Sequence, residues 1–180
     1  MIRTLGFAVT LALLSVATAK AQHHSDYASF AQRDIKSLSQ QQIDDLRAGA
    51  GMGLSLAAEL NGAPGPSHVL DLSGKLGLST DQIARISNIK DEMKASAIGL
   101  GSAIVELERN LDSAFRVGFV DEEKIASLTN ALGALNADLR LTHLEAHLKT
   151  RRILTESQVA TYTEARGYGL NSVNPLHRPH

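Results

Sequence analysis

The feature that most limits how this chain can fold is a local signal that occurs three times. Each copy places a hydroxyl residue three positions before a glutamine, at Ser39 to Gln42, Ser79 to Gln82 and Thr155 to Gln158. This is the spacing of a capping box, in which the hydroxyl oxygen accepts a backbone amide of the first turn and the glutamine accepts the amide of the cap residue. Each copy therefore predicts the start of an α-helix.

The apolar residues that follow these starts predict the length of each helix. After Ser79 they step by three or four residues, as in a long amphipathic helix that ends at Gly118. After Asp121 a second such pattern continues to about Ile153. Shorter helices are expected over about 40–60, 67–76 and 156–166. The sequence therefore predicts an all-α fold.

The two long helices are predicted to form an antiparallel hairpin, because only a short turn separates them. One hairpin cannot bury apolar residues on both of its faces, so we expect the shorter helices or a second copy of the chain to cover it, and we expect a homodimer. Gly49, Gly51 and Gly53 indicate close packing or a bend in the first helix. Gly99 and Gly101 indicate the close approach of a neighbour to the long helix.

Residues 1–21 have the features of an export signal. Arg3 precedes an apolar run from Leu5 to Ala17, which is too short to span a bilayer comfortably, and Ala19-Lys20-Ala21 places small residues where a signal peptidase reads them. We therefore expect cleavage after Ala21 and export of the mature chain. The chain has no cysteine, so packing or a partner chain must stabilise it in place of disulfides.

We expect three segments after the export signal: a flexible N-terminal segment over 22–38, a helical domain over 39–168 and a flexible tail over 169–180. The 18 basic residues include Arg3 and Lys20, so 16 remain against 19 acidic residues once the signal is removed. This mildly acidic balance argues against a nucleic-acid partner. No nucleophile-elbow or zinc-protease motif is present, so we expect a binding protein and not an enzyme.

Two motifs carry a resemblance to a known family. The segment Leu154-Thr155-Glu156-Ser157-Gln158 matches an LTxxQ motif, and Leu78-Ser79-Thr80-Asp81-Gln82 is a relaxed copy of it. Together with the export signal and the order of helices, these motifs make residues 38 to 168 similar to the Spy/CpxP family. The motif residues are Leu78, Ser79, Gln82, Leu154, Thr155 and Gln158. The resemblance implies a helical cradle, usually dimeric, and a periplasmic location in the bacterial envelope.

The resemblance implies one of two functions. The first is an ATP-independent chaperone that holds unfolded envelope proteins and requires no cofactor. Leu141, Leu144 and Leu148 form an apolar stripe that suits this function, although the same stripe could pack on the first helix or across a dimer. The nearby positive charges, which suit acidic client segments or a solvated helix end, are Arg140, Lys149, Arg151 and Arg152.

The second implied function is a heavy-metal sensor or resistance protein that binds zinc, nickel, cobalt or copper and works through an inner-membrane stress regulator. His143 and His147 lie four residues apart on one helix, a spacing that lets both imidazoles reach one ion. Two ligands bind weakly, so a metal site would need more, and Met52, Glu59 and His68 are the candidates if the first helix lies alongside. The alternative is a pair of ordinary, partly buried histidines.

Overall fold

The computed structural model describes residues 27–118 and 120–168. The predicted export signal and the predicted C-terminal tail lie outside these residues, as does the start of the predicted N-terminal segment. Every regular element within the described residues is a helix, which confirms the all-α prediction. None of these helices is both long and apolar enough to cross a membrane.

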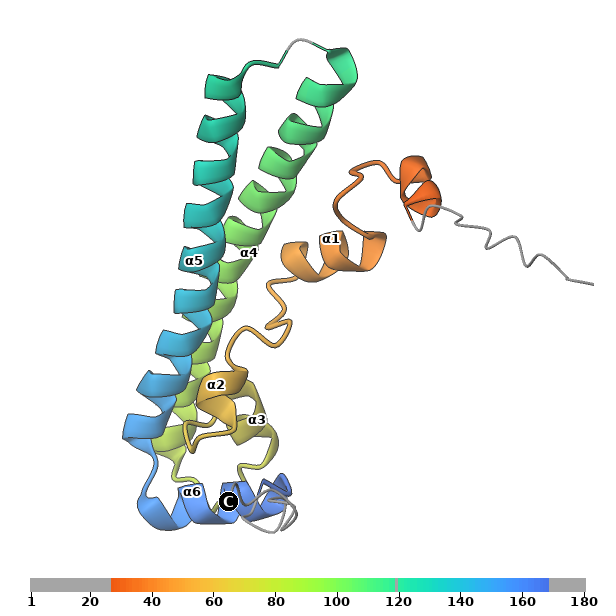
Figure 1. Ribbon diagram of the computed structural model, residues 1–180. Helices are drawn as coiled ribbons and strands as arrows, with labels where there is room; N and C mark the ends of the chain where they lie inside the picture. Colours follow the sequence, from red (N-terminus) through yellow and green to blue (C-terminus); the bar gives the residue numbers. More distant parts are fainter. Residues whose placement is uncertain (1–26, 119, 169–180) are drawn as a thin grey trace, which may run out of the picture.

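A long helical hairpin forms the frame of the molecule (Figure 1). Helix α4 spans Thr80–Val117 and α5 spans Glu122–Ile153, and the two run antiparallel with extensive contact. The 38 residues of α4 correspond to about 57 Å at 1.5 Å per residue. Gly118 ends α4 in the left-handed conformation, with φ of 76°, and Asp121 caps α5 through the amide of Lys124. The predicted hairpin is confirmed.

The shorter helices pack on this hairpin and at its base (Figure 1). Helix α1 (Gln40–Arg47) lies on α4, α2 (Leu56–Glu59) lies on α5, and α3 (Pro66–Asp71) contacts both. Helix α6 (Glu156–Ala165) crosses the base. One buried core joins α1 to the middle of the hairpin, and a second joins α3 and α6 to its base. The first includes Ile35, Ile43, Leu46, Ile104 and Leu139, and the second includes Val69, Ile86, Leu154 and Tyr162.

The prediction of one helix over 40–60 is wrong. Helix α1 ends at Arg47, and the chain then forms an irregular loop before the short α2. Gly49, Met52 and Gly53 all have positive φ, a conformation that an α-helix does not contain. The glycines therefore break the helix. The predicted helix over 67–76 is also shorter than expected, because α3 ends at Asp71.

Residues 27–38, within the predicted flexible segment over 22–38, pack against α4. These residues contain a 3-10 helix, η1 (Ala28–Gln32), and Ile35 is completely buried in the first core. The amide of Lys36 donates to Asp112 and the hydroxyl of Ser37 donates to Glu108, both on α4. Burial of an isoleucine contributes roughly 1.5–3 kcal/mol to holding this segment on α4, beside the two hydrogen bonds.

The glycines of α4 differ in their surroundings. A Cβ atom placed on Gly101 would lie 2.0 Å from the carbonyl oxygen of Leu46, so α1 approaches α4 directly over this residue. The prediction of a close neighbour is confirmed for Gly101. It is wrong for Gly99, which faces open space.

All three predicted capping boxes are present with both of their hydrogen bonds. Two of them also bond to each other. The side-chain amides of Gln82 and Gln158 form a reciprocal pair, with N···O distances of 2.9 and 3.1 Å. Each amide nitrogen also donates to a backbone carbonyl, that of Ile153 from Gln82 and that of Leu76 from Gln158. The two motif glutamines therefore join the start of α4 to the start of α6.

We expect Gln158→Ala to lower the free energy of unfolding by about 2 kcal/mol, because it breaks a capping box and leaves Gln82 without its partner. The matched control is Gln42→Ala, which removes a capping-box glutamine whose side chain bonds only Ser39 within the described chain. That change should cost on the order of 1 kcal/mol. Urea unfolding followed by circular dichroism measures both values. Equal losses would contradict a stabilising role for the glutamine pair.

Candidate functional site

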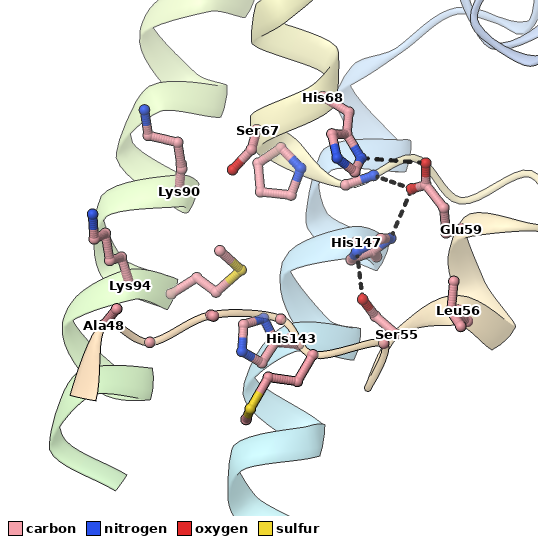
Figure 2. A pocket seen from close by; sticks show the side chains of 18 residues that line it. Ala48, Ser55, Leu56, Glu59, Ser67, His68, Lys90, Lys94, His143 and His147 are labelled. Carbon is pink, nitrogen blue, oxygen red and sulfur yellow. Dashed lines mark hydrogen bonds and ion pairs between the residues drawn. The ribbon is translucent and has the colours of Figure 1, made fainter. Parts of the chain in front are cut away.

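A cavity of about 560 Å³ lies beside the base of the hairpin (Figure 2). Its wall is formed by the loop that follows α1, by α2 and α3, and by facing residues of α4 and α5. All five residues predicted as metal-ligand candidates line it, namely Met52, Glu59, His68, His143 and His147. The structure therefore brings these residues to one cavity, although they come from four different segments of the chain.

His147 is held by hydrogen bonds on both of its ring nitrogens. Nδ1 lies 2.7 Å from the carbonyl oxygen of Ala63, so this nitrogen carries a proton and donates it. Nε2 lies 2.8 Å from the hydroxyl oxygen of Ser55. A Cβ on Gly65 would come within 2.7 Å of Nε2, so only a glycine fits against the ring. The imidazole is therefore fixed in orientation and tautomer.

His143 lies one turn before His147 and is equally buried, but it lacks such partners. Its Nε2 atom is buried and makes no hydrogen bond to any described residue. Burial lowers the pKa of His143, and the neighbouring His147 lowers it further. The imidazole is therefore neutral at physiological pH and presents an unused nitrogen inside the protein.

Glu59 is the centre of a polar network that joins α2 to α3, to α6 and to Tyr168. One carboxylate oxygen, Oε1, accepts hydrogen bonds from the hydroxyls of Tyr162 and Tyr168, and the other, Oε2, accepts the amide of Gly65 at 3.0 Å. The imidazoles of His68 and His147 lie 3.4 and 3.7 Å from the carboxylate, as Figure 2 shows. The side chain is only 6% exposed.

These contacts decide the charge of Glu59. Burial alone would raise the pKa of the carboxyl, but the hydrogen bonds from Tyr162 and Gly65 and the two nearby imidazoles lower it by more. Burial also raises the pKa of Tyr162, and Glu59 raises it further, so the phenol stays protonated and donates. Glu59 is therefore an ionised carboxylate at neutral pH, and each of its oxygens already accepts hydrogen bonds.

This arrangement does not favour the five-residue metal site. Glu59 lies on the Nδ1 side of His147, whereas the nitrogen that would face a metal is Nε2, which already bonds Ser55. Met52 is 43% exposed on the irregular loop. No three His, Asp, Glu or Cys residues come close enough together to hold an ion in the part of the chain that the structure describes. Metal binding by His143 and His147 stays a prediction.

No protein-family model, curated protein or solved structure matches this chain. The resemblance to the Spy/CpxP family therefore rests on the two motifs and the predicted export signal, and it stays a prediction.

Sequence reasoning did not find Ser55. The segment Gly53-Leu54-Ser55-Leu56-Ala57 resembles Gly-x-Ser-x-Gly except at its last position, but that motif belongs to a strand-to-helix turn, and the described residues form no strand. The local sequence is therefore only a weak signal, and the histidine that Ser55 contacts lies 92 residues further along the chain. The structure supplies the missing observation.

Proposed function

We propose that this protein is an ATP-independent, chaperone-like binding protein of the bacterial envelope that holds unfolded segments of other proteins. The observation that carries this proposal is apolar surface that no described part of the chain covers. On α5, Leu141 and Leu148 remain 52% and 50% exposed. Leu56 on α2, which packs against α5, and Leu60 at the end of α2 are exposed to a similar extent. We propose that these side chains form one apolar surface for a partner, since contiguous exposed apolar patches mark interaction sites.

The position of α1 supports this proposal over internal packing of the stripe. The stripe of Leu141, Leu144 and Leu148 would be part of the core if α1 covered the outer side of α5. Helix α1 lies on α4 instead. Leu144 is half-buried, whereas Leu141 and Leu148 remain open. The stripe therefore remains available to a client or to a second copy of the chain. We propose that the protein is a homodimer in which part of this surface stays free for clients.

Positive charges lie next to the stripe. Arg140 and Arg152 are exposed on α5, and Lys149 and Arg151 pair with glutamates at the surface. An apolar strip with positive charges at its border holds many different unfolded segments weakly, because neither contact requires one particular sequence. We propose that unfolded proteins of the envelope are the partners, and that the export signal brings the protein to them.

The test removes the apolar stripe and leaves the fold in place. We expect the double variant Leu141→Ser/Leu148→Ser to lose most of its ability to suppress the aggregation of an unfolded client, such as reduced α-lactalbumin, measured by light scattering without ATP. Both side chains are exposed, so the variant should unfold at nearly the same urea concentration as the unchanged protein.

Phe115 provides the matched control, because it is 58% exposed but lies at the far end of the hairpin. Phe115→Ser should leave the suppression unchanged. Equal loss in both variants would indicate a general effect of surface hydrophobicity. Full suppression by the double variant would remove the basis for the proposed client surface.

A further inference from the structure

Ser55 occupies an unusual position for a serine at the start of a helix. It is the N-cap residue of α2, but its side chain makes no capping hydrogen bond. Its hydroxyl instead lies 2.8 Å from Nε2 of His147, across the cavity wall (Figure 2). Serine at an N-cap normally stabilises the helix by accepting a backbone amide. Here that interaction is given up for the bond to the histidine.

The surroundings of His147 determine the direction of that bond. Nδ1 donates its proton to the carbonyl of Ala63 at 2.7 Å, so in the neutral ring Nε2 carries the lone pair. The hydroxyl of Ser55 is therefore the donor and Nε2 the acceptor. On the other side of the ring, the Glu59 carboxylate lies 3.7 Å from Nδ1. A positive charge that forms on the ring would be stabilised by this carboxylate.

From this geometry we infer that Ser55 is a nucleophile that accepts the acyl group of small carboxylic esters, with His147 as its general base and Glu59 as the group that stabilises the imidazolium. This inference goes beyond the proposed chaperone function and does not depend on it. It assigns the cavity a chemical role that sequence reasoning excluded, since we expected no enzyme.

The acyl transfer balances with these groups alone. The oxygen of Ser55 forms a bond to the carbonyl carbon of the ester while its proton moves to Nε2 of His147. The bond from that carbon to the alcohol oxygen then breaks, and the alcohol leaves with the proton from Nε2. Water then adds to the acyl carbon while giving a proton to Nε2. The bond from that carbon to the Ser55 oxygen breaks, Ser55 takes the proton from Nε2, and the carboxylic acid leaves.

The cavity suits a small ester. Its volume of about 560 Å³ lies within the range of small-molecule sites. Met52 and Met93 give it apolar surface, and the stems of Lys90 and Lys94 border it on α4. Within the described chain, the amides of Gly53 and Ser55 donate to no other residue. Since both residues line the cavity, their amides are the proposed donors to the negative charge that develops on the carbonyl oxygen.

The experiment uses a fluorophosphonate probe, which modifies serines activated in this way, and the mature protein in the presence of a metal chelator. We expect stoichiometric labelling, with the added mass located on Ser55 by peptide mass spectrometry. Ser55→Ala should abolish labelling, and His147→Ala should slow it at least 100-fold. The protein should also release nitrophenol from p-nitrophenyl acetate with an initial burst that Ser55→Ala lacks.

Ser67 is the matched control, because it lines the same cavity but bonds no histidine among the described residues. Ser67→Ala should label at the unchanged rate. His147 is buried, so its replacement by alanine can also disturb the fold. Gly65→Ala provides a second way to disturb the Ser55–His147 hydrogen bond, because the added Cβ would displace the imidazole ring. Circular dichroism shows whether this variant stays folded. Absence of labelling in the folded protein, labelling that persists in Ser55→Ala, or loss of reactivity on adding the chelator would each overturn the inference.

Discussion

Replacing Gly101 with alanine is expected to lower the free energy of unfolding by about 3 kcal/mol, the upper range for an overpacked core site. The added Cβ would lie 2.0 Å from the carbonyl oxygen of Leu46 and 2.7 Å from its carbonyl carbon. These are backbone atoms, so no side-chain rotation relieves the overlap. Helix α1 must therefore move away from α4, and the burial of Leu46 and Ile43 in the first core is lost in part.

Gly99→Ala is the matched control for this change. Gly99 lies two residues earlier on the same helix, and a Cβ atom there meets nothing within 4 Å. Because alanine has a higher helix propensity than glycine, this variant should be more stable by up to about 1 kcal/mol. Urea unfolding of the two variants gives effects of opposite sign. Stabilisation by Gly101→Ala would show that α1 does not pack against α4 as described.

The helices of this protein were the most predictable part of it, because their signals are local. Ser79 and Thr155 bond amides only three residues away, and Gly118 ends α4 through its own backbone conformation. Such interactions depend little on the rest of the fold. The antiparallel hairpin followed from the short turn between two long helices, and so its prediction also required no knowledge of distant contacts.

The errors arose where packing overrides local preference. The residues from Gln40 to Leu60 are mostly good helix formers, but the close approach to α4 requires Gly49 in a left-handed conformation, and α1 ends there. Ile35 lies in a polar segment without helical periodicity, so no local pattern marks it as a core residue. Its burial depends on α4, which begins 45 residues further along the chain at Thr80.

The site was only half predictable for the same reason. The four-residue spacing of His143 and His147 is visible in the sequence, and it correctly placed both on one helix face. What each histidine contacts is not visible. Ser55, Ala63 and Gly65 reach His147 because α2 and α3 pack against α5, and that packing decides that its ring nitrogens are occupied. The same packing leaves Nε2 of His143 without a partner.

Glu59 lines the cavity and also helps to hold the base of the molecule together. Its replacement should therefore have a large effect on the stability of the fold. We expect Glu59→Gln to lower the free energy of unfolding by about 3 kcal/mol, the usual cost of breaking a buried charged network. A glutamine has the same shape, but its amide nitrogen cannot accept a hydrogen bond. If that nitrogen faces Gly65, the bond from the Gly65 amide is lost; if it faces Tyr162, the phenol must accept and its own proton loses the Glu59 acceptor. Either orientation therefore leaves a buried donor without its present partner.

Glu59→Gln should also change how the stability of the protein depends on pH. The contacts that hold the pKa of Glu59 below its ordinary value are made by Tyr162, Gly65, His68 and His147. A carboxyl whose pKa is lower in the folded protein stabilises the fold at pH values above the pKa of an unfolded glutamate. That contribution disappears as the pH falls through the folded pKa. The unchanged protein should therefore lose stability steeply below about pH 4.5, and Glu59→Gln should lose less over the same interval.

Glu145→Gln is the control, because Glu145 is half-exposed and its only described partner is Lys149, at 4.0 Å. Its removal should cost at most about 0.5 kcal/mol and leave the pH dependence unchanged. Urea unfolding between pH 3 and pH 7 measures all three proteins. If Glu59→Gln followed the same pH curve as the unchanged protein, the carboxylate would not be the ionised centre of the network. The proposed stabilisation of the His147 imidazolium by Glu59 would then have no basis.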